Sequence, residues 1–340
     1  MRSPGFKRVS VYLLSAVSLA AAGWAAHGWY DNYHKIPKMR RVHAKVKGFR
    51  FTSPLLDVEL PEGVGVNSEP LPFRHKVKDF VDSQIKKGQA REIAVYYRDL
   101  HDGPWFGINE DSEFDPASMM KVPVMVCWLK RAEMNPQVLK EQLTYAYPDD
   151  MRVNQNFKSA QSVESGRSYT VEELLRLMMN YSDNNATRLL FEGLKPEELA
   201  DVLDGMDTVN RIQGDSNTVT VHGYSGLFRI LYNASYLNRV MSEKALQLLS
   251  LQDFPRGIVA GVPKGTVVSA KFGERARDAT KKHHQLHEFG IVYHPKHPYI
   301  LGIMTRGDEF GALTDVIRQI SQLVYTEVDA GTFSQEDNHR

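Results

Sequence analysis

The chain has 340 residues, which is enough for one large domain or two modest ones with a sizeable core. Hydrophobic residues make up 42% and charged residues 24% of the sequence, and both values are ordinary for a globular protein. The net charge is +1, so the composition does not favour nucleic acid as a partner. Because Cys127 is the only cysteine, an intrachain disulfide and a Cys-x-x-Cys metal site are excluded.

The N-terminus predicts a membrane anchor or an export signal over residues 1–30. Basic residues near the start precede an uncharged stretch over 9–30, and about 20 apolar residues are enough to cross a bilayer as a helix. This stretch is long for a signal peptide, so we expect an uncleaved anchor, although small residues at 20–22 leave cleavage open. The linker that follows, 31–70, is first basic and then rich in Pro and Gly.

The apolar pattern predicts the remaining elements in this chain order: a helix over 72–87, strands over 92–100 and 105–108, a mainly helical block over 119–251, strands over 266–272, 286–293 and 299–304, and a helix over 312–325. Within the helical block, Thr170 is an expected N-cap with Glu173 three residues later, as in a capping box. The tail after this last helix is polar.

Strands from both ends of the chain must share one sheet, so the middle of the chain forms an inserted lobe. The sequence therefore predicts an α/β fold, an α+β sandwich, with an antiparallel sheet, flanking helices and an inserted mainly helical lobe. We expect one domain over 71–327 and a polar tail over 328–340. Clefts between such lobes are common ligand sites.

Ser118 and Lys121 form the first candidate for chemistry, a Ser-x-x-Lys pattern. A serine hydroxyl needs a base to become a nucleophile, and residues three apart on a helix share a face. A lysine can be that base if burial or a nearby cation lowers its pKa. Ser83 and Lys86 repeat the spacing in an ordinary amphipathic helix and are expected at the surface. Ser118 instead follows the breaker at 114–117 and begins a helix that is apolar on nearly all sides.

Two further motifs have ordinary structural explanations when each is taken alone. Ser182, Asp183 and Asn184 are residue types that cap helices or form turns. Lys271, followed by Phe272 and Gly273, stands near the end of a predicted strand, where a lysine is usually solvated and guards an edge.

Together and in this order, the three motifs resemble the signature of class A β-lactamases and the related penicillin-interacting D,D-peptidases. The segments at 166–190, 261–266, 289–293 and 299–305 also look like the corresponding segments of that family, so the resemblance covers about residues 72–327. It implies a β-lactamase/transpeptidase-like fold, with Ser118 as nucleophile, Lys121 as its base and Ser182 as proton relay. It also implies that Asn184 binds the substrate amide or Lys121, and that Lys271, Phe272 and Gly273 form a substrate-binding strand. The backbone N–H groups of Ser118 and Glu274 would form the oxyanion hole.

The sequence departs from this family pattern in two places. Phe272 stands where the motif has a threonine, whose hydroxyl would donate to a substrate carboxylate, so a more apolar substrate end is expected. The family's Glu-x-x-Leu-Asn string, whose glutamate activates the deacylating water, is not found between Asn184 and Lys271. The nearest glutamate, Glu243, is expected on the surface of a helix. Acylation without efficient β-lactam turnover is therefore predicted.

We thus expect a serine hydrolase that acts on β-lactams or on D-amino-acid peptides or esters in the bacterial cell envelope, without a cofactor and as a monomeric catalytic domain. The alternative is a catalytically inactive envelope protein that keeps the fold for binding or scaffolding.

The Lys and Arg residues of the linker, counted alone, would place the linker and the domain after it in the cytoplasm. Because a basic segment can also lie on anionic lipid headgroups, we expect the domain outside the cell membrane. Histidines at 283, 284, 287, 294 and 297 are expected in a solvated hairpin rather than at a metal.

Overall fold

The structure is a computed structural model that describes residues 49–53, 71, 73–100, 103–205, 212–213, 216–276 and 282–331. The predicted anchor, most of the linker and the end of the polar tail lie outside these residues, so those predictions stay predictions. Within the described part of the chain, no helix is both long and apolar enough to cross a membrane.

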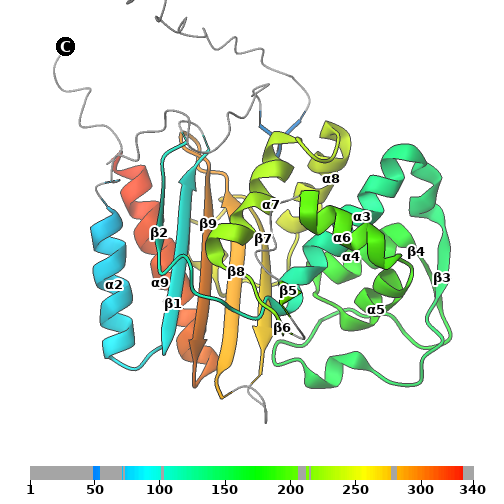
Figure 1. Cartoon of the computed structure of the whole chain (residues 1–340), viewed down its shortest axis with the longest axis horizontal. Helices are drawn as coiled ribbons and strands as arrows, with labels where there is room; N and C mark the ends of the chain where they lie inside the picture. Colours follow the sequence, from blue (N-terminus) through cyan, green and yellow to red (C-terminus); the bar gives the residue numbers. More distant parts are fainter. Residues whose placement is uncertain are drawn as a thin grey trace, which may run out of the picture. The chain divides into compact units, whose positions relative to one another are not determined.

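A five-stranded antiparallel sheet has the strand order β2-β1-β9-β8-β7 (Figure 1). Its strands are β1 (Glu92–Asp99), β2 (Trp105–Ile108), β7 (Val268–Arg275), β8 (His284–Val292) and β9 (Tyr299–Gly307). The N-terminal strand β1 pairs along its whole length with the C-terminal strand β9. This pairing confirms the prediction that one sheet takes its strands from both ends of the chain.

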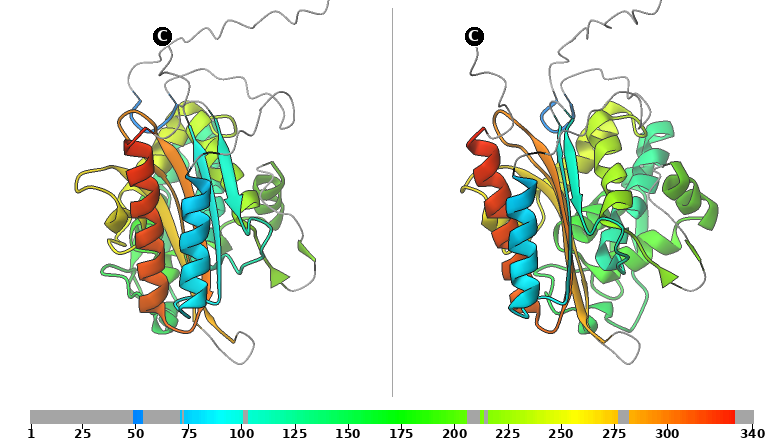
Figure 2. Two further views of the ribbon diagram at one scale, coloured as in Figure 1. Left: turned by 90° about the vertical axis from the view of Figure 1, so that its left-hand side faces the viewer. Right: turned by 60° about the vertical axis from the view of Figure 1, so that its left-hand side comes forward.

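Two helices, α2 (Arg74–Lys86) and α9 (Phe310–Asp329), lie side by side on one face of the sheet (Figure 2). Both faces of the central strands are therefore buried, and successive side chains enter different cores because the strand period is two. Tyr96 belongs to the core under the helical block, and its neighbour Tyr97 belongs to the core under α2 and α9. Both tyrosines are fully buried.

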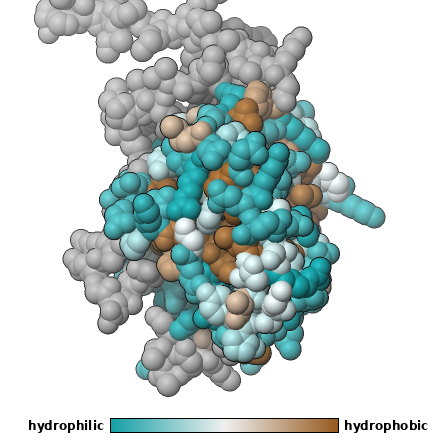
Figure 3. All heavy atoms as spheres, turned by 90° about the vertical axis from the view of Figure 1, so that its right-hand side faces the viewer, coloured by the Kyte–Doolittle hydropathy of each residue, from teal (hydrophilic) through white to brown (hydrophobic). Residues whose placement is uncertain are grey.

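The middle of the chain forms the helical block that covers the other face and extends beyond it. Its elements are η1 (Ala117–Met120), α3 (Lys121–Met134), η2 (Pro136–Lys140), β3 (Gln142–Thr144), η3 (Met151–Asn154), β4 (Ser168–Thr170), α4 (Val171–Asn180), α5 (Asn184–Glu192), α6 (Pro196–Gly205), β5 (Ile212–Gln213), β6 (Ser216–Asn217), α7 (Val221–Asn233), α8 (Arg239–Ser250) and η4 (Ile258–Gly261). The expected capping box of Thr170 and Glu173 is present at α4. The outward side of this block is mainly hydrophilic, with apolar atoms in small patches (Figure 3).

Residues 49–53 pack against the domain although they precede it by a long stretch of chain. The Glu243 carboxylate accepts the backbone N–H groups of Phe51 and Thr52, each at 2.9 Å. The Tyr293 hydroxyl donates to the Phe51 carbonyl at 2.9 Å. Glu243 is therefore half-buried rather than a free surface residue, and it holds an N-terminal segment instead of serving the catalytic site.

Candidate active site

Ser118 lies in a short 3-10 turn, η1, that leads directly into the buried helix α3. The residue before it, Ala117, has a φ of +48°, which is a left-handed conformation that alanine rarely adopts. The Asp115 carboxylate accepts the Ala117 N–H at 3.0 Å and supports this turn. Strained backbone of this kind often marks a functional site, and here it adjoins the predicted nucleophile.

Side chains from the sheet and from α7 hold this turn from behind. Gln285 Oε1 accepts the Asp115 N–H at 3.1 Å, and His287 Nε2 lies 3.0 Å from the Asp115 carbonyl oxygen. The Tyr224 hydroxyl donates to the Met119 carbonyl at 2.9 Å. All three side chains are buried, so the position of the turn depends on hydrogen bonds that water cannot replace.

The expectation of a solvated hairpin is wrong for His287, because β8 is a central strand that is covered on both faces. Burial lowers the pKa of His287 to about 3, so the ring is neutral near pH 7. Its Nδ1 accepts the Thr305 N–H at 3.2 Å, which leaves Nε2 to carry the proton and donate to Asp115. His287 thus serves as a structural donor beneath the serine turn.

The amine of Lys121 lies inside the site and makes three hydrogen bonds. Nζ is 2.6 Å from the Ser182 carbonyl oxygen, 3.0 Å from Ser182 Oγ and 2.7 Å from Asn184 Oδ1. The structure therefore brings together the first two motifs, as the resemblance implies. The hydrogen bonds of Lys121 in the described residues do not include Ser118, so the direct contact expected from their spacing is not formed in this arrangement.

Burial lowers the pKa of Lys121 to about 7, although the nearby carboxylates of Asp183 and Glu274 favour its protonated form. A neutral amine has two N–H donors and one lone pair. Two carbonyl-type oxygens, from the Ser182 backbone and the Asn184 side chain, match the two donors. The amine also lies 3.0 Å from Ser182 Oγ, so this hydroxyl is within reach for a proton transfer once the amine is neutral.

The Ser-Asp-Asn motif caps a helix and also supplies hydrogen-bond partners to Lys121. Asp183 is the N-cap of α5, with its carboxylate accepting the N–H groups of Asn185 and Ala186. Ser182 has a φ of +53°, a second strained position, and is fully buried. The cap fixes the start of the helix, and the residues on either side, Ser182 and Asn184, are thereby directed to Lys121.

Gly273 allows strand β7 to lie directly against the serine turn. A Cβ at this position would come within 2.6 Å of the Pro116 carbonyl oxygen and 3.0 Å of Met119 Cγ, so any larger residue would push the strand away. This close approach fits the predicted oxyanion hole, for which the backbone N–H groups of Ser118 and Glu274 must face one reacting atom. That role stays a prediction for both groups.

Lys271 is fully buried, which rules out the alternative of a solvated edge lysine. Its amine donates to the Phe272 carbonyl at 3.0 Å and lies 4.2 Å from the centre of the Phe272 ring. Burial holds its pKa well below the ordinary value, and the charge of Lys121 lowers it further, whereas Glu288 and Glu274 raise it. The two motif lysines are thus close enough to affect each other.

The ring of Phe272 does not face an open cleft, in contrast to its expected role at the substrate. The side chain is 3% exposed and stacks on Phe254 with ring centres 4.3 Å apart. Phe157 packs edge-on against it from the far side of the site, at 6.1 Å. A substrate would therefore meet this ring only after Phe157 had moved.

Residues 155–157, which we call the strap, connect the helical block to the edge of the sheet. Gln155 donates through Nε2 to the Ser182 carbonyl at 3.1 Å. The backbone N–H groups of Asn156 and Phe157 donate to the Glu274 carboxylate at 3.2 and 3.0 Å. The strap therefore joins the loop of the second motif to the residue after the third, across the site.

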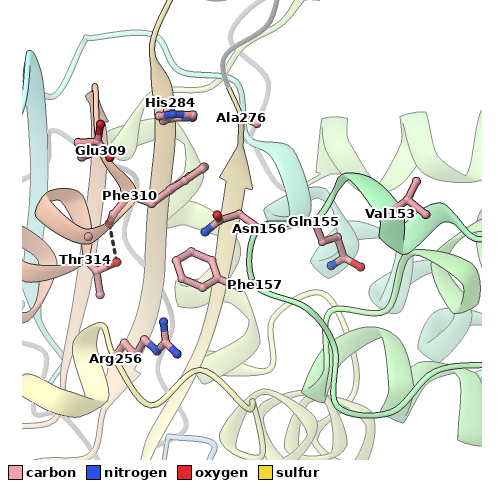
Figure 4. A pocket seen from close by; sticks show the side chains of 11 residues that line it. Val153, Gln155, Asn156, Phe157, Arg256, Ala276, His284, Glu309, Phe310 and Thr314 are labelled. Atoms are coloured by element: carbon pink, nitrogen blue, oxygen red, sulfur yellow. Dashed lines mark hydrogen bonds between the residues drawn. The ribbon is translucent and has the colours of Figure 1, made fainter.

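A cavity of about 740 Å³ lies beside the strap (Figure 4). Its lining includes the strap, Arg256, His284 and Phe310, but not Ser118 or Lys121. In Figure 4, Gln155 extends toward the helical block, and Phe157 lies on the side of β7 and Phe310. The space visible here is thus next to the motif residues rather than over them.

Residues 72–328 match the sequence model of the β-lactamase enzyme family. The chain belongs to this family. Similar solved structures include an acyl-enzyme complex of a PBP-A mutant with penicillin G, at 21% identity and a TM-score of 0.62, which covers 75% of this chain and 96% of that one. A β-lactamase from Sphaerobacter thermophilus has 18% identity and a TM-score of 0.61 over 74% of this chain and 95% of its own. A comparison with curated proteins finds no match.

The family motifs identified the residues that carry charge at the site but missed those that support them. Among these supporting residues, Glu288 is the one that the sequence could have indicated. Burying an acidic side chain in a strand that is covered on both faces costs free energy unless the residue has a function. Gln155 and His287 gave no such signal. Their roles depend on a loop and a strand that meet only in the folded family architecture.

Proposed function

We propose that this protein is a serine hydrolase that forms an acyl-enzyme at Ser118 with β-lactams or with D-amino-acid peptides or esters. The observation that carries the proposal is the buried Lys121 amine, held by Ser182 and Asn184 and with a pKa of about 7. Such a group can take a proton near neutral pH. The PBP-A mutant among the similar structures is described as an acyl-enzyme with penicillin G, which supports the same chemistry here.

In the proposed acylation, Ser118 Oγ attacks the carbonyl carbon of the substrate and the hydroxyl proton passes to the Lys121 amine. The bond from the carbonyl carbon to the leaving nitrogen or oxygen then breaks, and Ser182 returns a proton to the leaving group. The Ser182 hydroxyl is 3.0 Å from the amine, within range of such a transfer. Water later attacks the ester, releases the acid and restores the Ser118 hydroxyl.

We further propose that the second half of this cycle is slow for penicillins. The chain lacks the Glu-x-x-Leu-Asn string that supplies a base for the deacylating water in the resembled enzymes. Lys121 would then have to serve both half-reactions. A place of action in the cell envelope rests on the N-terminal sequence alone and is part of the proposal.

A non-catalytic binding protein is the second candidate, and the strap is the observation that favours it. Gln155 donates to the Ser182 carbonyl, Phe157 packs on Phe272, and Lys121 bonds Ser182 rather than Ser118. A strap that never moves would keep this arrangement, in which Lys121 bonds Ser182 instead of the partly exposed Ser118. The two candidates differ in whether the Ser118 hydroxyl is needed.

The test is to incubate the full-length protein with benzylpenicillin and to follow its intact mass with time, beside Ser118→Ala. We expect a mass increase of one penicilloyl group that persists for many minutes and is missing in the variant. A matched control is Ser83→Ala, which removes the serine of the other Ser-x-x-Lys pattern in α2.

Each result separates the candidates. Rapid decay of the adduct with product release would refute slow deacylation. If neither penicillin nor a general serine-reactive phosphonate labels Ser118, the hydrolase proposal is wrong and the binding protein remains.

A further inference from the structure

Three carboxylates of the protein act on the two motif lysines of the site. Lys121 and Lys271 are buried, and carboxylates of Asp183, Glu274 and Glu288 act on them electrostatically. A site built to attract an anion has an excess of positive charge. Here the carboxylates around the two lysines oppose an incoming anion, which bears on the substrate that the site can accept.

Glu274 is the carboxylate nearest to where a substrate would arrive. It follows Gly273, the residue that brings β7 against the serine turn. Its two oxygens accept the N–H groups of Asn156 and Phe157, at 3.2 and 3.0 Å, and its charge acts on both lysines. The strand thus supplies its own anion at the mouth of the site, and that anion already uses the donors of the strap.

Glu288 offsets Lys271 from the neighbouring strand. Gln252 and the Ile258 N–H each donate to its carboxylate at 2.7 Å, and Gly257 leaves room for it, because a Cβ there would lie 1.8 Å from Glu288 Oε2. Since the carboxylate is fully buried, it cannot move aside for another anion. Glu288 therefore acts on Lys271 electrostatically from a fixed position, while it accepts its hydrogen bonds from Gln252 and the Ile258 N–H.

An incoming substrate carboxylate would find no free hydrogen-bond donor beside Phe272 among the contacts described above. Phe272 offers a ring instead of a hydroxyl, and its carbonyl already accepts from Lys271. A buried anion without donors costs several kcal/mol, so the group would be rejected rather than tolerated. An uncharged ester or amide does not carry this cost of burying a charge.

We propose that Glu274 makes the site select acyl donors that carry no free carboxylate at the end facing β7, such as esters or amides of D-amino-acid peptides. This inference rests on the proposed acylation of Ser118. It assigns charge selection to one side chain.

The test compares two acyl donors that differ only in this charge, benzylpenicillin and its methyl ester. Rates of Ser118 acylation are measured by intact mass on the full-length protein, beside Glu274→Gln and the control Glu309→Gln. Glu309 lies at the start of α9 and lines the neighbouring cavity, but it is not among the charges that act on Lys121 or Lys271. Thermal unfolding establishes that each variant is folded.

We expect the wild-type protein to react with the ester at least tenfold faster than with the acid. In Glu274→Gln this ratio should fall several-fold, whereas in Glu309→Gln it should stay as in wild type. The wild-type preference does not depend on how any variant folds, so it tests the inference by itself.

Three results would overturn the inference. Equal rates, or faster reaction of the acid, with labelling that depends on Ser118 would refute it and leave the hydrolase proposal standing. An unchanged ratio in folded Glu274→Gln would refute the assignment to this residue. Absence of Ser118 labelling by both compounds would remove the hydrolase proposal and this inference together.

Discussion

The two walls of the site differ in how far they follow the family pattern. The helical wall, with Ser118, Lys121, Ser182 and Asn184, holds a buried base in a connected set of hydrogen bonds. The strand wall, residues 271–274 of β7, has an aromatic ring and a carboxylate where an anion would be bound. On the proposed function, the difference implies that the means of activating a serine is retained and that the recognition of the substrate has changed.

The strap connects these walls and makes the comparison testable. It bonds the helical wall through Gln155 and the strand wall through Glu274. A change in the helical wall should affect reaction with every acyl donor. A change in the strand wall or the strap should affect some donors more than others.

The largest expected effect belongs to the helical wall. Ser118→Ala should abolish the covalent adduct, and Lys121→Met should slow acylation by roughly a thousandfold or more, because general-base catalysis contributes about 10²–10⁴-fold. Both effects should be the same for charged and uncharged donors. Time-resolved intact mass with benzylpenicillin and its methyl ester measures them.

The control is Ser83→Ala, which should react as the wild type does. Acylation that survives in Lys121→Met at near wild-type rate would mean that another group is the base. The conclusion that the helical wall holds the base that activates Ser118 would then be wrong.

Much of the helical wall could be predicted from the sequence, since its signals are local. A breaker before Ser118 and an apolar helix after it predict a buried serine turn, and the capping residue Asp183 predicts the start of α5. Periodicity also predicted the sheet and the lobe, because central strands that are covered on both faces need unbroken apolar runs. Ends of elements differed by a few residues, as in α9, which extends to Asp329.

The strand wall could not be predicted in this way, because its properties arise from contacts between distant segments. Lys271 is buried only because the loops at 155–157 and 252–258 lie against β7 and β8. The strap has no periodicity and no motif of its own. Phe272 therefore suggested an apolar substrate, whereas the structure covers its ring with Phe157 and Phe254.

The next largest effect concerns the contact between the walls. In Gly273→Ala the new Cβ would clash with the Pro116 carbonyl, so β7 must shift from the serine turn. A displacement of about 1 Å can cost on the order of 100-fold in rate, and overpacking costs about 1–3 kcal/mol of stability. Acylation kinetics and denaturant unfolding measure both quantities.

Gly311→Ala is the matched control, because a Cβ there meets nothing within 4 Å and lies in the first turn of α9. It should be neutral or slightly stabilising. If Gly273→Ala behaves as this control does, β7 does not need its close approach and the oxyanion role of Glu274 is refuted.

A smaller effect should appear in the pH dependence of acylation. With the pKa of Lys121 at about 7, the amine is protonated and inactive below that pH, so the rate should fall about tenfold per unit there and level off above it. The Glu274 carboxylate favours the protonated amine, so Glu274→Gln should move the midpoint to lower pH. A midpoint unaffected by Glu274→Gln would show that the two walls are not coupled electrostatically.

The pH dependence of the free energy of unfolding gives an independent measure of the pKa of Lys121. The pKa of Lys121 is about 7 in the folded protein, below the ordinary lysine value of 10.5, so the unfolded chain binds more protons between these values. The contribution of Lys121 to the free energy of unfolding should therefore rise with pH across that window. Lys121→Met should lack this rise, which chemical denaturation at several pH values can establish.

The smallest effect is expected from the strap. Phe157 packs on Phe254 at 5.1 Å and on Phe310 at 5.8 Å, so Phe157→Ala should lower the free energy of unfolding by about 2 kcal/mol, less than for a fully buried phenylalanine. The same change should speed acylation by a bulky uncharged depsipeptide a few-fold, because the strap no longer covers Phe272. Phe191→Ala, on a ring that is 54% exposed, should change stability by less than about 0.5 kcal/mol. Slower acylation in Phe157→Ala would instead make the strap part of the substrate-binding surface, and the strand wall would then include a residue that no motif contains.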